Sequence, residues 1–287
     1  MTDVPADNLT DLGFQACLPS PLLRPYVVSF WAMRSHRPAV ITRSEYMHHN
    51  GAVGLMFNWG DPLPLDEGCY QPGVNVDVLT PQSRQLHIAG QQHVDGFGIL
   101  FKAGASFCVT GVPVAALQAH TLAPLGLRQA LSFDALNDAL YHADTFTQRV
   151  RVAENWLRTR LHGSFERPAS IDAAIRVLDR HPGVPIRRLS GVVNLSQRQL
   201  ERQFNDYLGL TPKQFGRVRR VQLARTQLKQ SPTQSLAALA QHMGYVDQAH
   251  FTREFAFHLK DTPGAYCQRV LERRAQTSRK PALPSIA

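Results

Sequence analysis

The stretch NLSQRQLERQFNDYL, residues 194–208, decides the fold, because its pattern returns as GYVDQAHFTREFAFHL at residues 244–259. Several positions recur at a spacing of 51: Leu200, Arg202, Phe204, Leu208, Thr211-Pro212 and Phe215 match Phe251, Arg253, Phe255, Leu259, Thr262-Pro263 and Tyr266. Just upstream the spacing is 50, and Ile186, Leu189 and Asn194 match Leu236, Leu239 and Gly244. An ordered set of matches at a fixed period indicates a duplicated unit.

Each unit reads as two helices joined by a tight turn. Leu200, Phe204 and Leu208 lie on one face of a helix, since they follow the i, i+4, i+8 pattern. A shorter helix precedes it at about 187–193, and its counterpart covers 236–243. Asn194 and Gly244 suit the left-handed turn between the helices, and the next helix starts after a capping residue, Ser196 or Asp247. This pattern predicts two helix-turn-helix motifs, at about 186–208 and about 236–259.

The outward faces of the two second helices are candidate DNA-contacting surfaces. In this motif the second helix enters the major groove with its N-terminal residues. The residues expected to face outward are Arg198, Glu201, Arg202 and Asn205 in the first copy, and Gln248, Ala249, Thr252 and Arg253 in the second. Arg suits guanine or phosphate, Gln suits adenine, Glu accepts from cytosine, and Ala or Thr contacts a thymine methyl. An ordinary solvated helix surface is the alternative, but the recurrence of Arg202 at Arg253 favours DNA.

Residues from about 171 to 270 resemble the DNA-binding domain of the AraC/XylS family of bacterial transcription regulators. The second copy carries the most specific motifs: LAALA at 236–240, GYVDQAHFTREF at 244–255 and TPGAY at 262–266. The usual family form has Gly-Phe, a Ser-rich turn, Phe-x-Arg-x-Phe, then a Pro and an aromatic residue, so mainly the turn differs here. The first copy departs further, with Ser190-Gly191 where the family favours Ala and Asn194 where it favours Gly.

The resemblance implies a sequence-specific transcription regulator rather than an enzyme. In this family, base and phosphate contacts are assigned to the positions that match Arg198, Glu201, Arg202, Gln248, Ala249, Thr252 and Arg253. Double-stranded DNA is the implied partner. RNA polymerase, a small-molecule effector and a second copy of this chain are further candidate partners, and the ligand-binding residues are not identified by the sequence.

A long helix is expected between the two motifs, from Lys213 to Gln230. Pro212 suits the first turn of that helix. An apolar stripe runs along it (Val218, Val221, Ala224 and Leu228), with cations around the stripe (Arg217, Arg219, Arg220, Arg225 and Lys229). The cations either form a solvated face or meet phosphates. A rod of this kind would set the separation of the two motifs, so we expect one chain to contact two adjacent major grooves, about 34 Å apart.

The charge distribution agrees with a nucleic-acid partner. The chain carries 31 Lys+Arg and 22 Asp+Glu, a formal net charge of +9. From residue 168 onward there are 19 Lys+Arg and 8 Asp+Glu, so the excess of positive charge lies in the segment with the helix pairs. Such an excess is typical of a surface that neutralises phosphates.

Residues 20–105 read as β structure. Short strand-like runs lie at 26–31, 53–57, 74–79, 86–88 and 97–101, separated by turns that contain Pro or Gly, which is typical of a small barrel or sandwich. The segment resembles the cupin-like barrel that many AraC-type regulators carry. The predicted fold class is therefore α+β, with an N-terminal mainly-β cupin-like barrel with flanking helices and a C-terminal all-α domain. Seven residues either line a ligand pocket inside this barrel or form the hydrophobic core of the barrel: Trp31, Met33, Met56, Phe57, Trp59, Phe97 and Phe101.

A metal-dependent cupin enzyme with a helical appendage is the rival interpretation. Enzymatic cupins bind a metal through a His-x-His pair, a Glu and a distant His. This chain has adjacent His48 and His49, which point to opposite faces of a strand, together with His87 and His93. We therefore expect no metal, no cofactor and no catalytic residues. A barrel that mediates only protein contacts is a third interpretation.

The expected domains are 1–163, a sensory or dimerisation domain with a helical extension, and 168–275, the DNA-binding domain, followed by a disordered tail at 276–287. The stripe of Phe146, Val150, Ala153, Leu157 and Leu161 predicts a helix that packs on the barrel or pairs with its copy in a dimer. Ser170 is expected to cap the first helix after the linker. We expect a cytoplasmic protein without a membrane partner, because the sequence shows no leader and no apolar run long enough to span a bilayer. The four cysteines are scattered, so no disulfide framework is expected.

Overall fold

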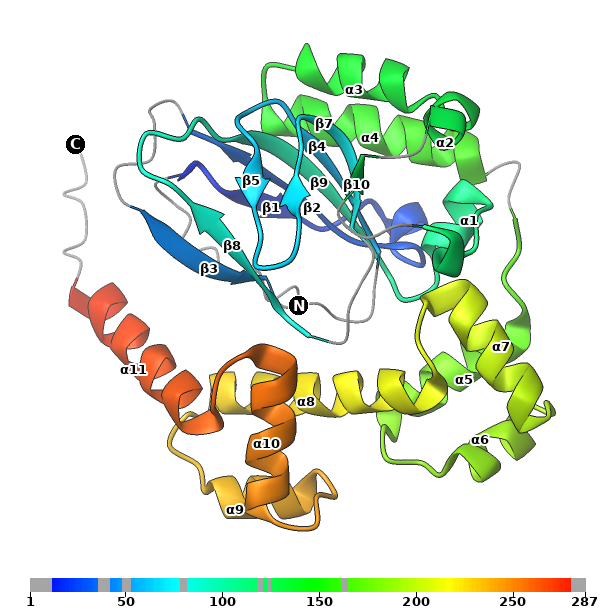
Figure 1. The fold of residues 1–287 in the computed structure, drawn as a ribbon, viewed down its shortest axis with the longest axis vertical. Helices are drawn as coiled ribbons and strands as arrows, with labels where there is room; N and C mark the ends of the chain where they lie inside the picture. The colour runs from blue at the N-terminus through cyan, green and yellow to red at the C-terminus, as the bar shows by residue number, and fades with distance from the viewer. Residues whose placement is uncertain are drawn as a thin grey trace.

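The structure is a computed structural model that describes residues 12–35, 42–47, 53–77, 82–117, 121–122, 125–161 and 165–279. A strand-rich part is followed along the chain by a helical part, so the predicted α+β class is confirmed (Figure 1). The helical part contains a long helix with two small helix groups packed against it. Within the described part of the chain, no helix combines the length and apolarity needed to cross a membrane.

A six-stranded antiparallel sheet forms the centre of the strand-rich part. Its order is β1 (Gln15–Cys17), β2 (Val27–Arg34), β9 (Asp95–Phe101), β4 (Gly54–Asn58), β7 (Gly73–Asp77) and β10 (Thr121–Leu122). The register aligns apolar side chains across it: Phe30 and Leu55 both lie opposite Ile99, and Leu55 lies opposite Val76. Neighbouring side chains in such a row pack directly on each other, and these four are buried.

Two small sheets complete the strand-rich part. They pair β3 (Arg43–Met47) with β8 (Arg84–Ile88), and β5 (Leu63–Pro64) with β6 (Cys69–Tyr70). Each of the five runs predicted as strands overlaps an observed strand, although residues 78–79 lie outside the described residues. The polar strand β3 was not predicted, because its sequence RSEYM has too few apolar residues to distinguish it from a loop.

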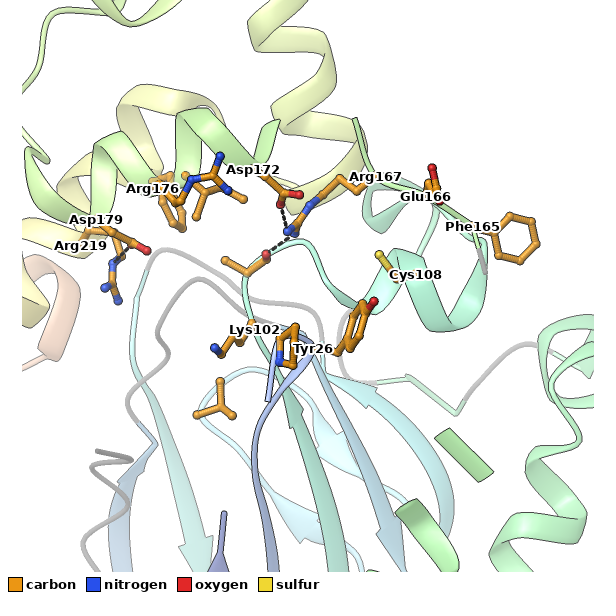
Figure 2. A pocket seen from close by; sticks show the side chains of 15 residues that line it. Tyr26, Lys102, Cys108, Phe165, Glu166, Arg167, Asp172, Arg176, Asp179 and Arg219 are labelled. Carbon is orange, nitrogen blue, oxygen red and sulfur yellow. Dashed lines mark hydrogen bonds and ion pairs between the residues drawn. The ribbon is translucent and has the colours of Figure 1, made fainter. Parts of the chain in front are cut away.

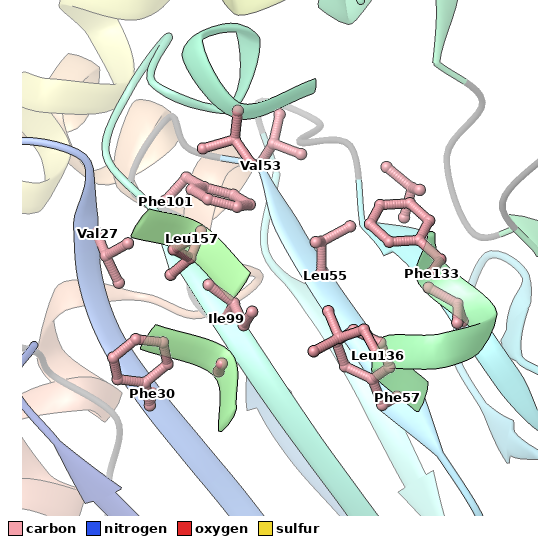
Figure 3. Packing of buried hydrophobic residues seen from close by; sticks show 14 of the residues in the cluster. Val27, Phe30, Val53, Leu55, Phe57, Ile99, Phe101, Phe133, Leu136 and Leu157 are labelled. Carbon is pink, nitrogen blue, oxygen red and sulfur yellow. The ribbon is translucent and has the colours of Figure 1, made fainter. Parts of the chain in front are cut away.

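Helices cover one face of the large sheet. These are α3 (Phe133–Tyr141) and α4 (Phe146–Leu161), accompanied by the shorter α1 (Ser106–Thr110) and α2 (Leu125–Ala130). Figure 3 shows Leu136 and Leu157 from the helices against Phe57 and Ile99 from the strands. The apolar stripe of α4 therefore packs on the sheet. Of the two alternatives that the sequence left open, packing on the strand-rich part and pairing with a second copy, the structure shows the first. Ala153 and Leu157 are fully buried there.

The seven residues that the sequence assigned either to a ligand pocket or to the barrel core belong to two packed clusters. Phe57, Phe97, Phe101 and Trp59 join the cluster beneath α3 and α4, and Met33, Met56 and Trp31 join the second cluster. Met56 and Phe57 are consecutive in β4 and so point to opposite faces of the sheet. These side chains serve as core.

A buried ion pair fastens α4 to the sheet. Arg149 Nη1 donates to Asp95 Oδ1 at 2.8 Å, and both side chains are less than a tenth exposed. The guanidinium also lies over the Trp59 ring, 4.4 Å from its centroid. Arg34 approaches the same carboxylate at 3.5 Å. Because an isolated buried charge is costly, the pair holds α4 in one orientation.

We expect Arg149→Ala to lower the free energy of unfolding by about 3–5 kcal/mol, because it leaves Asp95 buried with its main partner removed. Urea denaturation followed by circular dichroism measures the loss. Arg151→Ala is the matched control, since Arg151 is exposed on the same helix and should change stability by less than about 0.5 kcal/mol. Equal effects of the two substitutions would contradict the role given to the pair.

The helical part contains α5 (Ala169–Arg180), α6 (Ile186–Val192), α7 (Gln197–Leu208), α8 (Pro212–Gln230), α9 (Leu236–His242), α10 (Gln248–Leu259) and α11 (Pro263–Arg279). One face of α5 is apolar and buried (Ile171, Ala174, Ile175 and Leu178). Ser170 is not the cap of α5: Pro168 occupies that position, and the Ser170 hydroxyl lies within the helix, 3.4 Å from Gln203 Oε1. Helix α11 continues to Arg279, past the predicted start of the tail at 276, and residues 280–287 lie outside the described residues.

The helical part contacts the strand-rich part at both of its ends. At the first, the ring of Tyr207 on α7 meets Phe107 of α1 edge-on, with centroids 4.9 Å apart. At the second, the Ser83 N–H donates to the His258 carbonyl at 2.6 Å, and Lys260 pairs with Asp66. Burial raises the pKa of the Asp66 carboxyl, but the bond to Lys260 and its charge, with backbone donors, outweigh this and lower it. The contact is therefore ionic at neutral pH.

Candidate nucleic-acid interface

The first helix-turn-helix unit consists of α6, a turn and α7. Asn194 takes the left-handed conformation in the turn, with φ at 53°, which Asn tolerates better than most residues. Ser196 then caps α7: its hydroxyl accepts from the Gln199 N–H at 3.2 Å, and the Gln199 side chain accepts from the Ser196 N–H at 3.0 Å. This reciprocal capping box fixes where the helix begins. The predicted turn and cap are confirmed.

The second unit, α9 and α10, repeats this construction with different residues. Gly244 takes the left-handed turn position with φ at 73°. Asp247 caps α10, since its carboxylate accepts from the His250 N–H at 2.6 Å. A carboxylate at a helix N-terminus also interacts favourably with the helix dipole.

The duplication is preserved in three dimensions. The rings of Phe204 and Phe215 lie 6.0 Å apart at 64°, and the rings 51 positions later, Phe255 and Tyr266, lie 5.9 Å apart at 64°. The second helix of each unit, α7 or α10, is called the recognition helix from here on. Each recognition helix is followed by a residue in the left-handed conformation, Gly209 in the first copy and Lys260 in the second. Equivalent positions in the two units therefore have equivalent surroundings.

The residues predicted to face outward do so. In the first unit Arg198, Glu201, Arg202 and Asn205 are exposed; in the second, Gln248, Ala249 and Arg253 are exposed and Thr252 is half-buried. Within the part of the chain that the structure describes, the guanidinium groups of Arg202 and Arg253 have no hydrogen-bonding partner. Arg202 and Arg253 therefore occupy equivalent places in the two units, and both are exposed.

Helix α8 joins the two units through two different apolar contacts. Phe215, near its start, belongs to the core of the first unit, while Val221, Ala224 and Leu228 belong to the core of the second. The 19 residues of α8 correspond to a length of about 28 Å at 1.5 Å per residue. The predicted rod is confirmed as a helix that carries one unit near each end (Figure 1).

Most cations around the α8 stripe belong neither to a free solvated face nor to an open phosphate-binding surface. Glu254, buried on the inner face of α10, accepts from Arg217 Nε at 2.5 Å and from Arg220 Nη2 at 2.8 Å. Arg219 pairs with Asp179 of α5 at 2.7 Å, and Arg225 is buried. Sequence periodicity could not show these pairs, because each carboxylate lies on another helix.

The Glu254 cluster holds the second recognition helix on α8. Arg220 also stacks over the Tyr245 ring at 4.2 Å from its centroid. Burial of the Tyr245 hydroxyl, followed by the nearby Glu254 charge, raises the pKa of that phenol well above its usual value. Tyr245 therefore stays neutral, and the cluster contains two cations, one carboxylate and one phenol.

We expect Glu254→Ala to lower the free energy of unfolding by about 1–3 kcal/mol, because it removes charge-assisted bonds to both arginines. Gln203→Ala is the matched control, since Gln203 occupies the equivalent position in the first unit and, among the described residues, makes only a long bond to Ser170. Thermal unfolding measures stability, and hydrogen exchange of the α10 amides locates the loss. A loss no larger than that of the control would contradict the role of the cluster.

Of the four histidines considered as metal ligands, the structure describes His87 and His93. His87 Nδ1 lies 2.8 Å from the Ser44 hydroxyl across the β3–β8 pair, and His93 is exposed. His48 and His49 lie outside the described residues. Among the residues that are described, no group of three or more His, Cys, Asp or Glu side chains could hold a metal ion.

Comparison with known proteins gives two family matches. The family described as a helix-turn-helix domain matches residues 189–269, and a domain of unknown function (DUF6597) matches residues 15–123. The first match begins within α6 and covers the rest of both duplicated units, and the second covers most of the strand-rich part.

Two relatives and one solved structure are similar to about a third of the chain each. A probable transcription factor PqrA from Proteus vulgaris is 33% identical over 89 residues, which is 31% of this chain and 72% of that protein. An uncharacterized HTH-type transcriptional regulator from Haemophilus influenzae is 33% identical over 85 residues, 30% of this chain but only 28% of that protein. A probable AraC family transcriptional regulator from Rhodopseudomonas palustris is 20% identical with a TM-score of 0.33, covering 36% of this chain and 98% of that one.

Two capped helix-turn-helix units on one connecting helix define a double helix-turn-helix DNA-binding domain. With its relationship to the Proteus transcription factor, the chain belongs to the AraC/XylS family of transcription regulators.

Proposed function

We propose that this protein binds specific DNA sites by placing α7 and α10 in two adjacent major grooves. The observation that carries the proposal is the pair of equivalent exposed faces held near the two ends of α8. Helix α8 is about 28 Å long. This length is close to the separation of about 34 Å between successive major grooves on one side of a duplex. Because the units are fastened to one helix, both can meet the same face of the duplex.

Base contacts are assigned to the exposed residues at the start and middle of each recognition helix. In α7 these are Arg198, Glu201 and Arg202; in α10 they are Gln248, Ala249 and Arg253, together with the half-buried Thr252. Arg202 and Arg253 suit guanine or phosphate, Gln248 suits adenine, and Ala249 suits a thymine methyl. The cations that pair with Glu254 and Asp179 contribute to the orientation of the helices instead of contacting phosphate directly.

The strand-rich part is proposed to regulate this binding. We assign residues 1–163 to a sensing or dimerising domain and 168–275 to the DNA-binding domain. A small-molecule effector or a second copy of the chain would bind to the sensing or dimerising domain. RNA polymerase would be a further partner at the promoter. The contacts Tyr207–Phe107 and Lys260–Asp66 support this coupling, because each links a recognition helix to the strand-rich part.

Arg253→Ala should weaken binding to the specific DNA site by about 1–3 kcal/mol if the guanidinium contacts a base. Arg180→Ala is the charge-matched control, since Arg180 is exposed on α5 outside both recognition helices. Genome-wide mapping of bound DNA supplies the site, and fluorescence anisotropy at constant salt measures affinity. Unchanged affinity of Arg253→Ala would remove this residue from the proposed contacts.

The two-groove arrangement is tested by hydroxyl-radical footprinting. The intact protein should protect two patches about one helical turn apart, and Arg202→Ala should weaken one patch while Arg253→Ala weakens the other. Protection confined to one groove, or no preference among oligonucleotides at moderate salt, would contradict the proposed function.

A further inference from the structure

The spacing between the two copies changes from 50 to 51 residues inside the turn of the helix-turn-helix unit. In the first unit, Leu195 is followed directly by the capping residue Ser196. In the second unit, Val246 stands between Tyr245 and the capping residue Asp247. Val246 is therefore the one additional residue of the second turn, and the first turn has no counterpart to it.

The backbone hydrogen bonds of the two turns support this alignment. The Leu195 N–H donates to the Ser190 carbonyl at 3.0 Å, and the Tyr245 N–H donates to the Ala240 carbonyl at 2.9 Å. Donor and acceptor are each displaced by 50 residues between the copies. The two turns are therefore built alike up to Leu195 and Tyr245, and the additional residue comes after them.

Val246 contributes little to the core of the second unit. An apolar residue just before a helix cap often packs against the fourth residue of the helix, in a hydrophobic staple. Tyr245 makes that contact instead, because it is buried and its ring centroid lies 5.2 Å from that of Phe251. The Val246 side chain is 88% exposed, the highest exposure of any large hydrophobic side chain among the described residues. Packing therefore does not account for a valine at this position.

The strand-rich part covers a different side of the helical part. Figure 2 shows the cavity between the two parts, with Tyr26 and Lys102 at the end of the sheet across from Arg176 and Asp179 of α5. Among the described residues, none from the α9–α10 turn lines this cavity. The turn lies at the end of α10 that is remote from the strands (Figure 1). Val246 is therefore open to a partner that approaches the start of α10.

We propose that Val246 contacts the C5-methyl group of a thymine in the major groove that receives α10, an inference that rests on the proposed function. A recognition helix enters the groove with its N-terminal residues, and Val246 lies two residues before Gln248, the first residue of α10. Valine cannot donate a hydrogen bond to phosphate. The apolar group that a base edge offers in this groove is the thymine methyl.

The first unit offers no equivalent contact. Leu195, the last residue before the cap of α7, is partly buried and packs against the core of the first unit. The part of the DNA site that contacts α10, here called the second half-site, should therefore carry a thymine preference that the half-site of α7 lacks. The additional residue makes the two similar units differ in the sequence that each prefers.

Affinity is measured by fluorescence anisotropy on the mapped DNA site, with each thymine replaced in turn by deoxyuridine, which removes only the C5-methyl group. For the natural chain, one replacement in the second half-site should weaken binding about threefold to fourfold, as expected for the loss of one buried methyl group. Val246→Ala should weaken binding to the unmodified site about threefold to tenfold. The variant should no longer respond to that replacement, because the two changes remove the same contact.

Leu271→Ala is the matched control, since Leu271 is an exposed apolar residue of α11, outside both recognition helices. It should leave the affinity for every site unchanged. Thermal unfolding of both variants checks that the domain is folded. Replacements in the half-site of α7 should affect the natural chain and Val246→Ala equally.

Undiminished binding of Val246→Ala to the unmodified site would overturn the inference. Equal weakening by Val246→Ala on the unmodified site and on every deoxyuridine site would overturn it too, because the side chain would then contact the sugar or the backbone. The two proposals fail in different ways. Specific binding by the natural chain without this coupling refutes only the thymine contact, whereas a natural chain that prefers no DNA site refutes the proposed function and the contact with it.

Discussion

Burial of opposite ends of α8 in two separate cores is the constraint on which the helical part depends. Phe215 is enclosed by the first unit, while Val221, Ala224 and Leu228 are enclosed by the second. Neither unit is large, so each relies on the shared helix to bury its apolar face. A helix in the middle of two cores cannot bend without exposing one of them. The relative placement of α7 and α10 follows from this shared packing.

The two copies have kept their packing and diverged in their polar contacts. The aromatic pairs Phe204–Phe215 and Phe255–Tyr266 have almost the same geometry. In contrast, Gln203 makes one long bond to Ser170, whereas Glu254 at the equivalent position binds two arginines of α8. The left-handed residue after α10 is Lys260, at the position where the first copy has the left-handed Gly209. The Lys260 ammonium pairs with Asp66 in the strand-rich part. Divergence at these positions ties the second copy to its neighbours by charge.

Sequence periodicity identified the elements of the helical part because each depends on local chemistry. Ser196 and Asp247 start helices wherever their oxygen can accept the free N–H groups of the first turn, and Asn194 and Gly244 tolerate the turn conformation. The strands were found where apolar residues dominate, as in β4 and β9, and missed in the polar β3. Ser170 was misassigned as a cap because Pro168, two residues earlier, already has the extended backbone that a cap requires.

The sequence by itself determined the duplicated helix-turn-helix units, their outward faces and the long helix between them, since repeat spacing and helix caps act over a few residues. Only the tertiary structure decided which charges are used internally. Glu254, Asp179 and Asp95 pair with arginines on other elements, which the spacing of residues along the sequence does not show. The physical reason is that an ion pair depends on distance in space and on burial, neither of which is contained in the spacing of residues along a chain.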